Sequence, residues 1–315
     1  MFRQRLKTFI HSLYIKIMSL FLLVIIPLFL LGLSIYLWGY DMVKKEIDHS
    51  SVSQINLYTQ SIESEISRIQ KLQYEFVNDQ DLLYLTNAFE IMDNFERSQY
   101  MLRIQNRLEI LKSSSKYMKD VVVHIPRLGK SISADSGVEP LWDNWNDTIT
   151  NMHRADSSGI TFKNNQIIMD ISYPVNIKEG KTPLIMVESA LSNQSIIETL
   201  NGFNQYTDSA FLIANQDQTY LLTTNPSLKI DYNIFDRMNK FSSETFSYRY
   251  DSIPALVTYS HLNKLNLQLI SIVPTNHILG KIQQFKIFFI FFMITLMVVI
   301  TIFIIFIRLM IHKPF

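Results

Sequence analysis

The sequence has no cysteine, and it has only eight glycines and nine prolines in 315 residues. Without cysteine there is no disulfide, no thiolate nucleophile and no cysteine-ligated metal. The glycines are scattered, and no Gly-rich nucleotide loop, G-x-S-x-G or H-E-x-x-H motif occurs. We therefore expect no catalytic residue, no metal and no cofactor, and we expect that this chain does not itself bind ATP or transfer phosphate.

Two stretches lack charged residues altogether, the 24 residues 17–40 and the 21 residues 287–307. A helix rises about 1.5 Å per residue, so each stretch is long enough to cross a hydrocarbon core of roughly 30 Å. We expect transmembrane helices at 17–40 and 286–308. A cleaved signal peptide is the alternative for the first, but its apolar core is too long and no small-x-small cleavage site follows Trp38.

The charges that flank these stretches predict the orientation of the chain. Residues 1–16 carry four basic residues and no acid, and the second stretch is followed by Arg308 and Lys313. Short basic flanks stay on the cytoplasmic side, so we expect a multi-pass membrane protein with both termini cytoplasmic. The segment 41–286 has 23 basic residues against 28 acidic ones, a net charge near −5. That balance excludes a nucleic-acid partner, which would require a basic surface.

The segment 41–119 contains neither proline nor glycine and is predicted to form long extracytoplasmic helices. Isoleucine or phenylalanine recurs every seven residues at Ile55, Ile62, Ile69 and Phe76. This stripe packs either on the chain's own domain or against a second copy in a dimer, and the pattern does not separate the two. A second helical stretch is expected over 81–112. Its predicted apolar face consists of Leu82, Leu85, Phe89, Met92, Phe95, Leu102, Leu108 and Leu111.

From Asp120 the pattern changes to short β-branched runs separated by turns, such as Asn164-Asn165. We expect five strands and a closing helix in a first module, 120–205, and five strands with one helix in a smaller second module, 206–280. Antiparallel strands beside a helical spine predict an α+β fold. The expected strands are 121–125, 131–133, 160–163, 166–175 and 184–190, then 210–215, 219–223, 245–250, 255–261 and 267–273.

This order of elements resembles the double Cache domain of bacterial receptors, in which two PAS-like sheets follow a long membrane-anchored helix. The hairpin that begins at Val121–Pro126 resembles the outer domain of YesM-type sensor histidine kinases, and 309–315 resembles the start of a HAMP linker. The resemblance implies a membrane-distal module at 120–205 and a membrane-proximal one at 206–280. It also implies a homodimer, a small extracellular ligand, and a cytoplasmic response regulator reached through a kinase region beyond Phe315.

In double Cache domains the ligand lies in the distal module, between the sheet and a covering loop, which here is 141–156. Tryptophan rings beside carboxylates suit sugar recognition, and they could equally hold a cationic group, while an arginine could bind a carboxylate. Each candidate also has a structural explanation, namely core packing, a strand end or a solvated surface charge. The predicted ligand-binding residues are Trp142, Trp145, Arg154, Asp170 and Tyr173. Asp170 and Tyr173 have opposite strand parity, so both line one pocket only if a bulge separates them.

The sequence thus favours the ligand-sensing and transmembrane input region of a two-component sensor histidine kinase. The same input could serve a chemoreceptor, a diguanylate cyclase or a membrane-anchored AraC-type regulator. A two-span solute-capture or structural membrane protein is an alternative of another class. An ectoenzyme would need a buried acid–base pair, and the sequence offers no convincing one.

Overall fold

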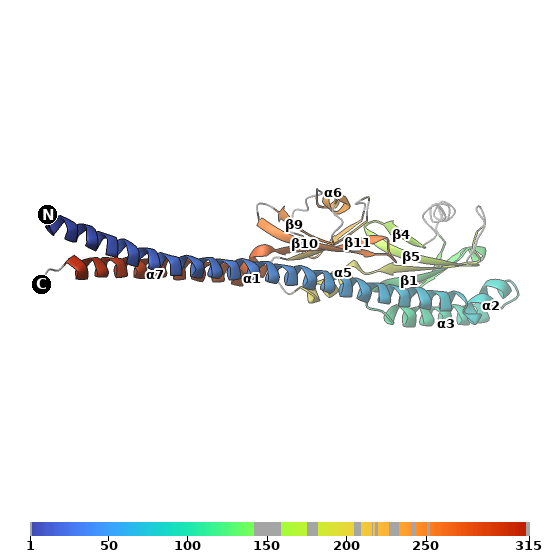
Figure 1. The fold of residues 1–315 in the computed structure, drawn as a ribbon. Helices are drawn as coiled ribbons and strands as arrows, with labels where there is room; N and C mark the ends of the chain where they lie inside the picture. The colour runs from blue at the N-terminus through green and yellow to red at the C-terminus, as the bar shows by residue number, and fades with distance from the viewer. Residues whose placement is uncertain are drawn as a thin grey trace. The chain divides into compact units, whose positions relative to one another are not determined.

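The computed structural model describes residues 2–141, 159–174, 182–204, 209–215, 217, 220–226, 233–240, 244–250 and 253–312. These residues form two compact units. The first unit comprises the two ends of the chain, 1–51 and 275–315, and the second comprises 52–274. The first helix, α1 (Phe2–Val77), contributes to both units, and the last helix, α7 (Thr275–His312), belongs to the first (Figure 1).

The unit formed by the chain ends is a pair of apolar helices. Stretches within Ile25–Val77 and Lys286–Phe306 are long and apolar enough to cross a membrane. Tyr36 of α1 stacks on Phe289 of α7, with ring centroids 5.4 Å apart. A Cβ on Gly32 would lie 3.5 Å from the Phe289 ring, so a small residue allows close approach here. Large apolar side chains on both helices are exposed, which suits a lipid environment.

The heptad stripe on α1 is buried within the second unit. Ile55, Ile62, Ile69 and Phe76 are between 0% and 8% exposed, and they belong to one core cluster with strand residues of both sheets. Of the two interpretations that the spacing left open, packing on the chain's own domain is therefore the one observed for this stripe. The opposite side of the helix carries polar residues and isolated apolar ones such as Leu57.

The stretch expected as a single helix over 81–112 consists of two helices, α2 (Gln80–Ala88) and α3 (Asn94–Ser113). Each begins at an aspartate whose side chain accepts a hydrogen bond from a backbone N–H three residues later, Asp79 for α2 and Asp93 for α3. The apolar face of α3 also differs from the expectation, because Phe95 and Leu102 are 69% and 59% exposed whereas Ile104 is fully buried. Leu108 and Leu111 are buried as expected, and with Ile104 they form the i, i+4, i+7 face of α3, on which Phe95 and Leu102 do not lie.

The first sheet has six antiparallel strands in the order β3-β2-β1-β6-β5-β4. The sequence predicted five of them. The additional strand, Gly137-Val138-Glu139-Pro140, contains residues that disfavour strands and forms because it pairs with β2 at the sheet edge. The strands are β1 (Met118–Ile125), β2 (Lys130–Ser133), β3 (Gly137–Pro140), β4 (Ile160–Lys163), β5 (Gln166–Tyr173) and β6 (Ile185–Leu191).

The second sheet has five antiparallel strands in the order β8-β7-β11-β10-β9. Helix α5 (Asn193–Gly202) connects the sheets, and α6 (Asn233–Lys240) follows β8. The strands are β7 (Ala210–Ala214), β8 (Leu221–Thr223), β9 (Thr245–Tyr250), β10 (Ile253–Leu262) and β11 (Leu267–Pro274). The predicted α+β class, with two antiparallel sheets beside a long N-terminal helix, is confirmed.

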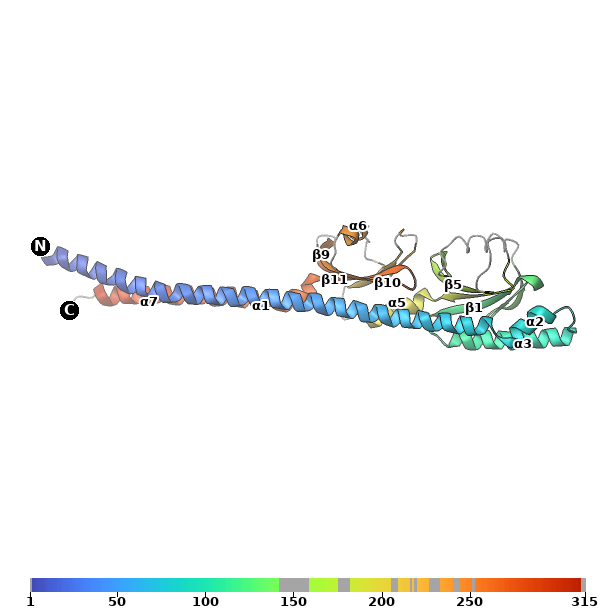
Figure 2. The ribbon, with the colours of Figure 1, turned by 45° about the vertical axis from the view of Figure 1, so that its right-hand side comes forward.

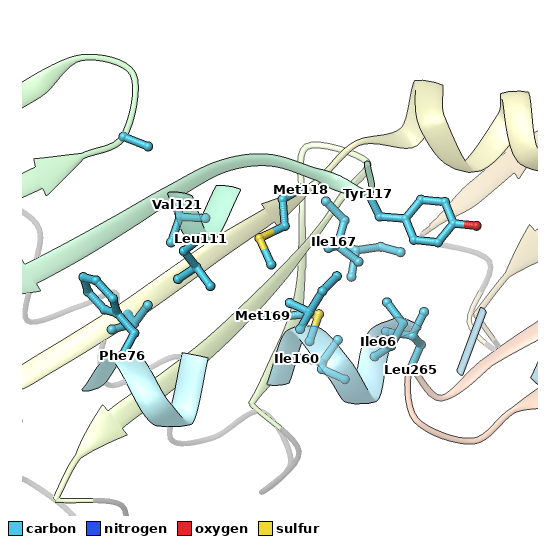
Figure 3. Close-up of a cluster of buried hydrophobic side chains, with 14 of the residues drawn as sticks. Ile66, Phe76, Leu111, Tyr117, Met118, Val121, Ile160, Ile167, Met169 and Leu265 are labelled. Carbon is cyan, nitrogen blue, oxygen red and sulfur yellow. The ribbon is translucent and has the colours of Figure 1, made fainter. Parts of the chain in front are cut away.

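Both sheets pack along α1, one after the other (Figures 1 and 2). Ile66 and Phe76 of α1 reach the cluster that also contains Met169 of β5 and Leu265 from the turn before β11 (Figure 3). Two polar contacts bind α1 to the second sheet: Ser260 Oγ donates to Asn56 Oδ1 at 2.8 Å, and the Lys264 N–H donates to Glu63 at 3.2 Å. The helix is therefore a shared spine for the two sheets.

The buried stripe predicts a large effect of truncation at its centre. Ile69→Ala removes a side chain with no exposed surface, so the free energy of unfolding is expected to fall by about 2–4 kcal/mol. The matched control is Leu57→Ala, on the same helix but 62% exposed, for which we expect a change within about 0.5 kcal/mol. Denaturant unfolding of the full chain in detergent measures both. Equal losses would show that the stripe is not the main buried face of α1.

Candidate functional site

The first sheet has two chemically different faces. On the face we call inner, Val123, Ile132 and Val187 lie in the apolar core. Gln73 of α1 contacts this face, where its Nε2 donates hydrogen bonds of 2.9 Å to Met169 O and to Ser189 Oγ. The opposite face, which we call outer, is built from the alternate strand positions. The register places on it Val122, His124, Ser131, Ser133, Ile168, Asp170, Ser172, Met186, Glu188 and Ala190.

The centre of the outer face is buried even though the described helices pack on the other side. His124 is 1% exposed, Met186 3% and Ile168 6%. His124 Nδ1 lies 2.8 Å from Ser131 Oγ, and its Nε2 lies 3.6 Å from Glu188 Oε2. The imidazole thus connects β1 to its neighbours on either side, β2 and β6.

Asp170 is directly opposite Glu188 in the register of β5 and β6. Its backbone N–H donates to Gly159 O at 2.8 Å. Among the residues that the structure describes, no group donates a hydrogen bond to its buried Oδ1. Burial, and secondly the negative charge of Glu188, raises the pKa of the Asp170 carboxyl to about 6.

A second carboxylate on this face, Asp120, serves as a contrast. Its oxygens accept hydrogen bonds from Ser133 Oγ at 3.1 and 3.3 Å, and from the Val121 N–H at 2.8 Å. Burial raises the pKa of Asp120 as well, but these donors act in the opposite direction. Asp120 is therefore satisfied by its neighbours, whereas Asp170 Oδ1 accepts no hydrogen bond from the part of the chain that the structure describes.

The arrangement around Asp170 suits a cation. Two adjacent carboxylates in a partly buried position repel each other, and a bound positive charge relieves that repulsion. The outer-face positions next to this pair on β5 and β6 are occupied by Ile168, Ser172, Met186 and Ala190. None of these four positions supplies a lysine or arginine to neutralise Asp170 and Glu188.

The sequence-predicted site residues are distributed unevenly. Asp170 lies at the centre of the outer face. Tyr173 belongs to the other face, because the β5–β6 register runs without a bulge from Ile168 to Tyr173, and its ring packs against the inner core. The bulge that would bring both into one pocket is absent between these strands. The three remaining candidates, Trp142, Trp145 and Arg154, lie outside the described residues.

Sequence reasoning did not select His124, Ser131 or Glu188 as site residues. A signal was present, since His124 lies between Val123 and Ile125 in a β-branched run that predicts a strand. Strand parity alone could not show that it meets Glu188, because that pair depends on β1 lying beside β6, which is 60 residues away in the chain.

No protein-family model and no curated protein matches the sequence. Solved structures do match. The ligand-binding domain of the Pseudomonas fluorescens chemoreceptor CtaA, in complex with L-isoleucine, has 12% identity and a TM-score of 0.51, and the match covers 77% of this chain and 98% of that one. The sensory domain of the Campylobacter jejuni chemoreceptor Tlp3, with isoleucine bound, has 11% identity and a TM-score of 0.50, with coverage of 76% and 96%.

The sensor domain of the V. cholerae histidine kinase DctB also matches, at 12% identity and a TM-score of 0.46, over 73% of this chain and 98% of that one. The match to the two chemoreceptor domains concerns the fold, and it confirms the predicted double Cache architecture. The narrower resemblance to YesM-type kinases stays a prediction. This chain therefore has the fold of these chemoreceptor domains, joined to two helices that are able to span a membrane.

Proposed function

We propose that this chain is the extracytoplasmic ligand-sensing and transmembrane input region of a bacterial signalling protein, with a two-component sensor histidine kinase as the first candidate for the whole. The observation that carries the proposal is the buried carboxylate of Asp170, whose Oδ1 accepts no hydrogen bond from any described residue and which lies beside Glu188 on the outer face. A fold of sensor domains and a pair of candidate membrane helices support it.

The proposed ligand is a small molecule with a protonated amine, bound at the outer face of the first sheet. Asp170 and Glu188 would accept the ammonium hydrogens, and His124 would orient Glu188. The CtaA and Tlp3 domains hold isoleucine, a ligand that carries such an amine. Trp142, Trp145 and Arg154 remain proposed contacts to the rest of the ligand. A sugar is the alternative ligand, since the same tryptophans could stack on it.

The proposed topology places both termini in the cytoplasm and the two sheets outside. Ligand binding would favour one of two packings of the domain and shift α7, which follows β11 directly. The proposed partners are a second copy of the chain and a response regulator reached through a kinase region. A chemoreceptor is the second candidate for the whole protein, because the matches with a TM-score of 0.50 or more reported above are chemoreceptor domains.

A ligand screen tests the proposal. Thermal unfolding of the full chain in detergent is recorded with amines, amino acids, sugars and organic acids. A ligand at about 100 times its dissociation constant stabilises the folded state by about 2.7 kcal/mol, which is a shift of a few degrees. We expect amine-containing compounds to produce such a shift, and Trp142→Ala to reduce it.

The control in this screen is the variant Glu90→Gln, which removes an exposed carboxylate distant from the outer face in sequence and should respond as wild type does. If only sugars stabilise the chain, the amine assignment is wrong although the sensor function stands. If no class of compound stabilises it, the sensor function itself is contradicted, and the two-span structural alternative takes its place.

A further inference from the structure

The turn between β4 and β5 has features beyond those of an ordinary hairpin. Asn164 and Asn165 both have positive φ, 52° and 55°, as a two-residue turn of this kind requires, and asparagine tolerates that conformation. The sequence predicted this tight turn. The turn itself requires only a positive φ at these two positions. Any further role of Asn164 or Asn165 therefore depends on the contacts of its side chain.

The Asn165 side chain forms a pair of hydrogen bonds with one residue of the second sheet. The Leu221 N–H donates to Asn165 Oδ1 at 3.2 Å, and Asn165 Nδ2 donates to Leu221 O at 3.2 Å. Leu221 is on β8, the edge strand. Its neighbours Tyr220 and Thr224 bond to the β7 side of the hairpin, so by the alternation of an antiparallel ladder the Leu221 groups point outward. The amide of Asn165 therefore completes the edge as a peptide group would.

A second set of hydrogen bonds connects Asn165 to the second sheet through Asn193 of α5. Asn193, in the first turn of α5, donates from Nδ2 to Asn165 O at 2.6 Å. The Tyr220 hydroxyl donates to Asn193 Oδ1 at 3.0 Å. Tyr220 is fully buried, and its ring lies 5.1 Å from that of Phe162 on β4. One turn of the first sheet is thus bonded to the edge strand of the second both directly and through α5.

We propose that Asn165 couples the two sheets, so that a change along β5 is transmitted to β8 through the Asn165 amide. Asp170 lies on β5, five residues beyond Asn165, which is about 17 Å at the usual rise of a strand. A strand is stiff along its length, so a displacement at Asp170 reaches the turn. That Asp170 is a ligand contact rests on the proposed function, whereas the coupling itself does not.

The first experiment is hydrogen–deuterium exchange on the full chain in lipid nanodiscs. Asn165→Gly keeps the positive φ without strain and removes only the amide. Asn164→Gly is the matched control, since it changes the adjacent turn residue, whose side chain has no hydrogen bond to the second sheet among those described. We expect exchange at 220–224 to accelerate about tenfold in Asn165→Gly and less than twofold in Asn164→Gly. Equal rates in the two variants would overturn the proposal.

The second experiment is a double-mutant cycle that needs no ligand. Asp170→Asn serves as the perturbation of the first sheet, and exchange at 220–224 is the readout. We expect this substitution to change the readout in the wild-type background and to leave it unchanged in the Asn165→Gly background. A change of the same size in both backgrounds would mean that the coupling runs elsewhere, for instance along α1, and no change in either would mean that the sheets are independent; both outcomes contradict the proposal. A failed ligand screen would leave this cycle unaffected.

Discussion

Replacing Asp170 with Asn is expected to stabilise the domain at neutral pH and to abolish its response to ligand. The pKa of Asp170 is raised to about 6 in the folded chain from an ordinary value of 3.8, so between these two pH values the folded state binds more protons than the unfolded state. The stability of the wild type therefore falls as the pH rises from about 4 to about 6, by on the order of 2–3 kcal/mol, and this contribution is constant above that range. Asparagine does not ionise, so the variant does not lose this free energy of unfolding as the pH rises.

The measurement is the free energy of unfolding of wild type and Asp170→Asn at several pH values from 4 to 8. The free energy of unfolding of Asp170→Asn minus that of the wild type should rise from about pH 4 to about pH 6 and then level off. Asp120→Asn is the matched control on the same face. Because its carboxylate already accepts hydrogen bonds from Ser133 and Val121, we expect no comparable gain in stability. A loss of stability in Asp170→Asn at pH 7.5 would show that the carboxylate has a structural role and would refute the site.

The ligand response of the wild type should depend on pH in the corresponding direction. Protonation of Asp170 removes the negative charge that a cationic ligand needs, so affinity is expected to weaken below about pH 6. Calorimetric titration with whichever amine the screen identifies measures this directly. An affinity that does not change between pH 5 and pH 8 would show that the ligand does not bind to the Asp170 carboxylate.

Gly159→Ala is expected to disrupt the same site through the backbone. Gly159 has a φ of +65°, and a Cβ there would lie 2.4 Å from Asp170 O, which belongs to a strand and cannot move aside freely. Left-handed strain of about 1–2 kcal/mol and this clash together should lower the free energy of unfolding by about 3 kcal/mol or more. Because this clash displaces β5 and with it Asp170, we also expect the variant to lose its response to ligand.

Gly129→Ala is the control that has the left-handed backbone strain but no clash. Gly129 has a nearly identical φ of +59°, but a Cβ there would meet no atom within 4 Å. We expect this variant to lose only about 1 kcal/mol and to keep its ligand response. Similar losses in the two variants, measured by denaturant unfolding, would show that the contact with Asp170 O is relieved easily and that the position does not constrain the site.

Much of the fold was predictable because its signals are local. Short strand-like runs bounded by turns predicted β5 and β6, the Asn164-Asn165 turn joined β4 to β5, and the uncharged runs located the candidate membrane helices. The errors occurred where a short-range contact overrides the average pattern. The aspartate cap at Asp93 starts a new helix within an unbroken apolar pattern, and β3 exists only because β2 is beside it.

The alternation of residues along each strand follows from the sequence alone, and so does the expectation that Asp170 and Tyr173 point in opposite directions unless a bulge separates them. The absence of a bulge between them, and the position of Asp170, Glu188 and His124 on one face, depend on how the strands pair. The physical reason is that parity is a property of one strand, whereas proximity depends on the order β1-β6-β5, which pairs segments far apart in the chain. The same holds for the Asn165 amide, whose partner Leu221 is brought to it only when both sheets pack along α1.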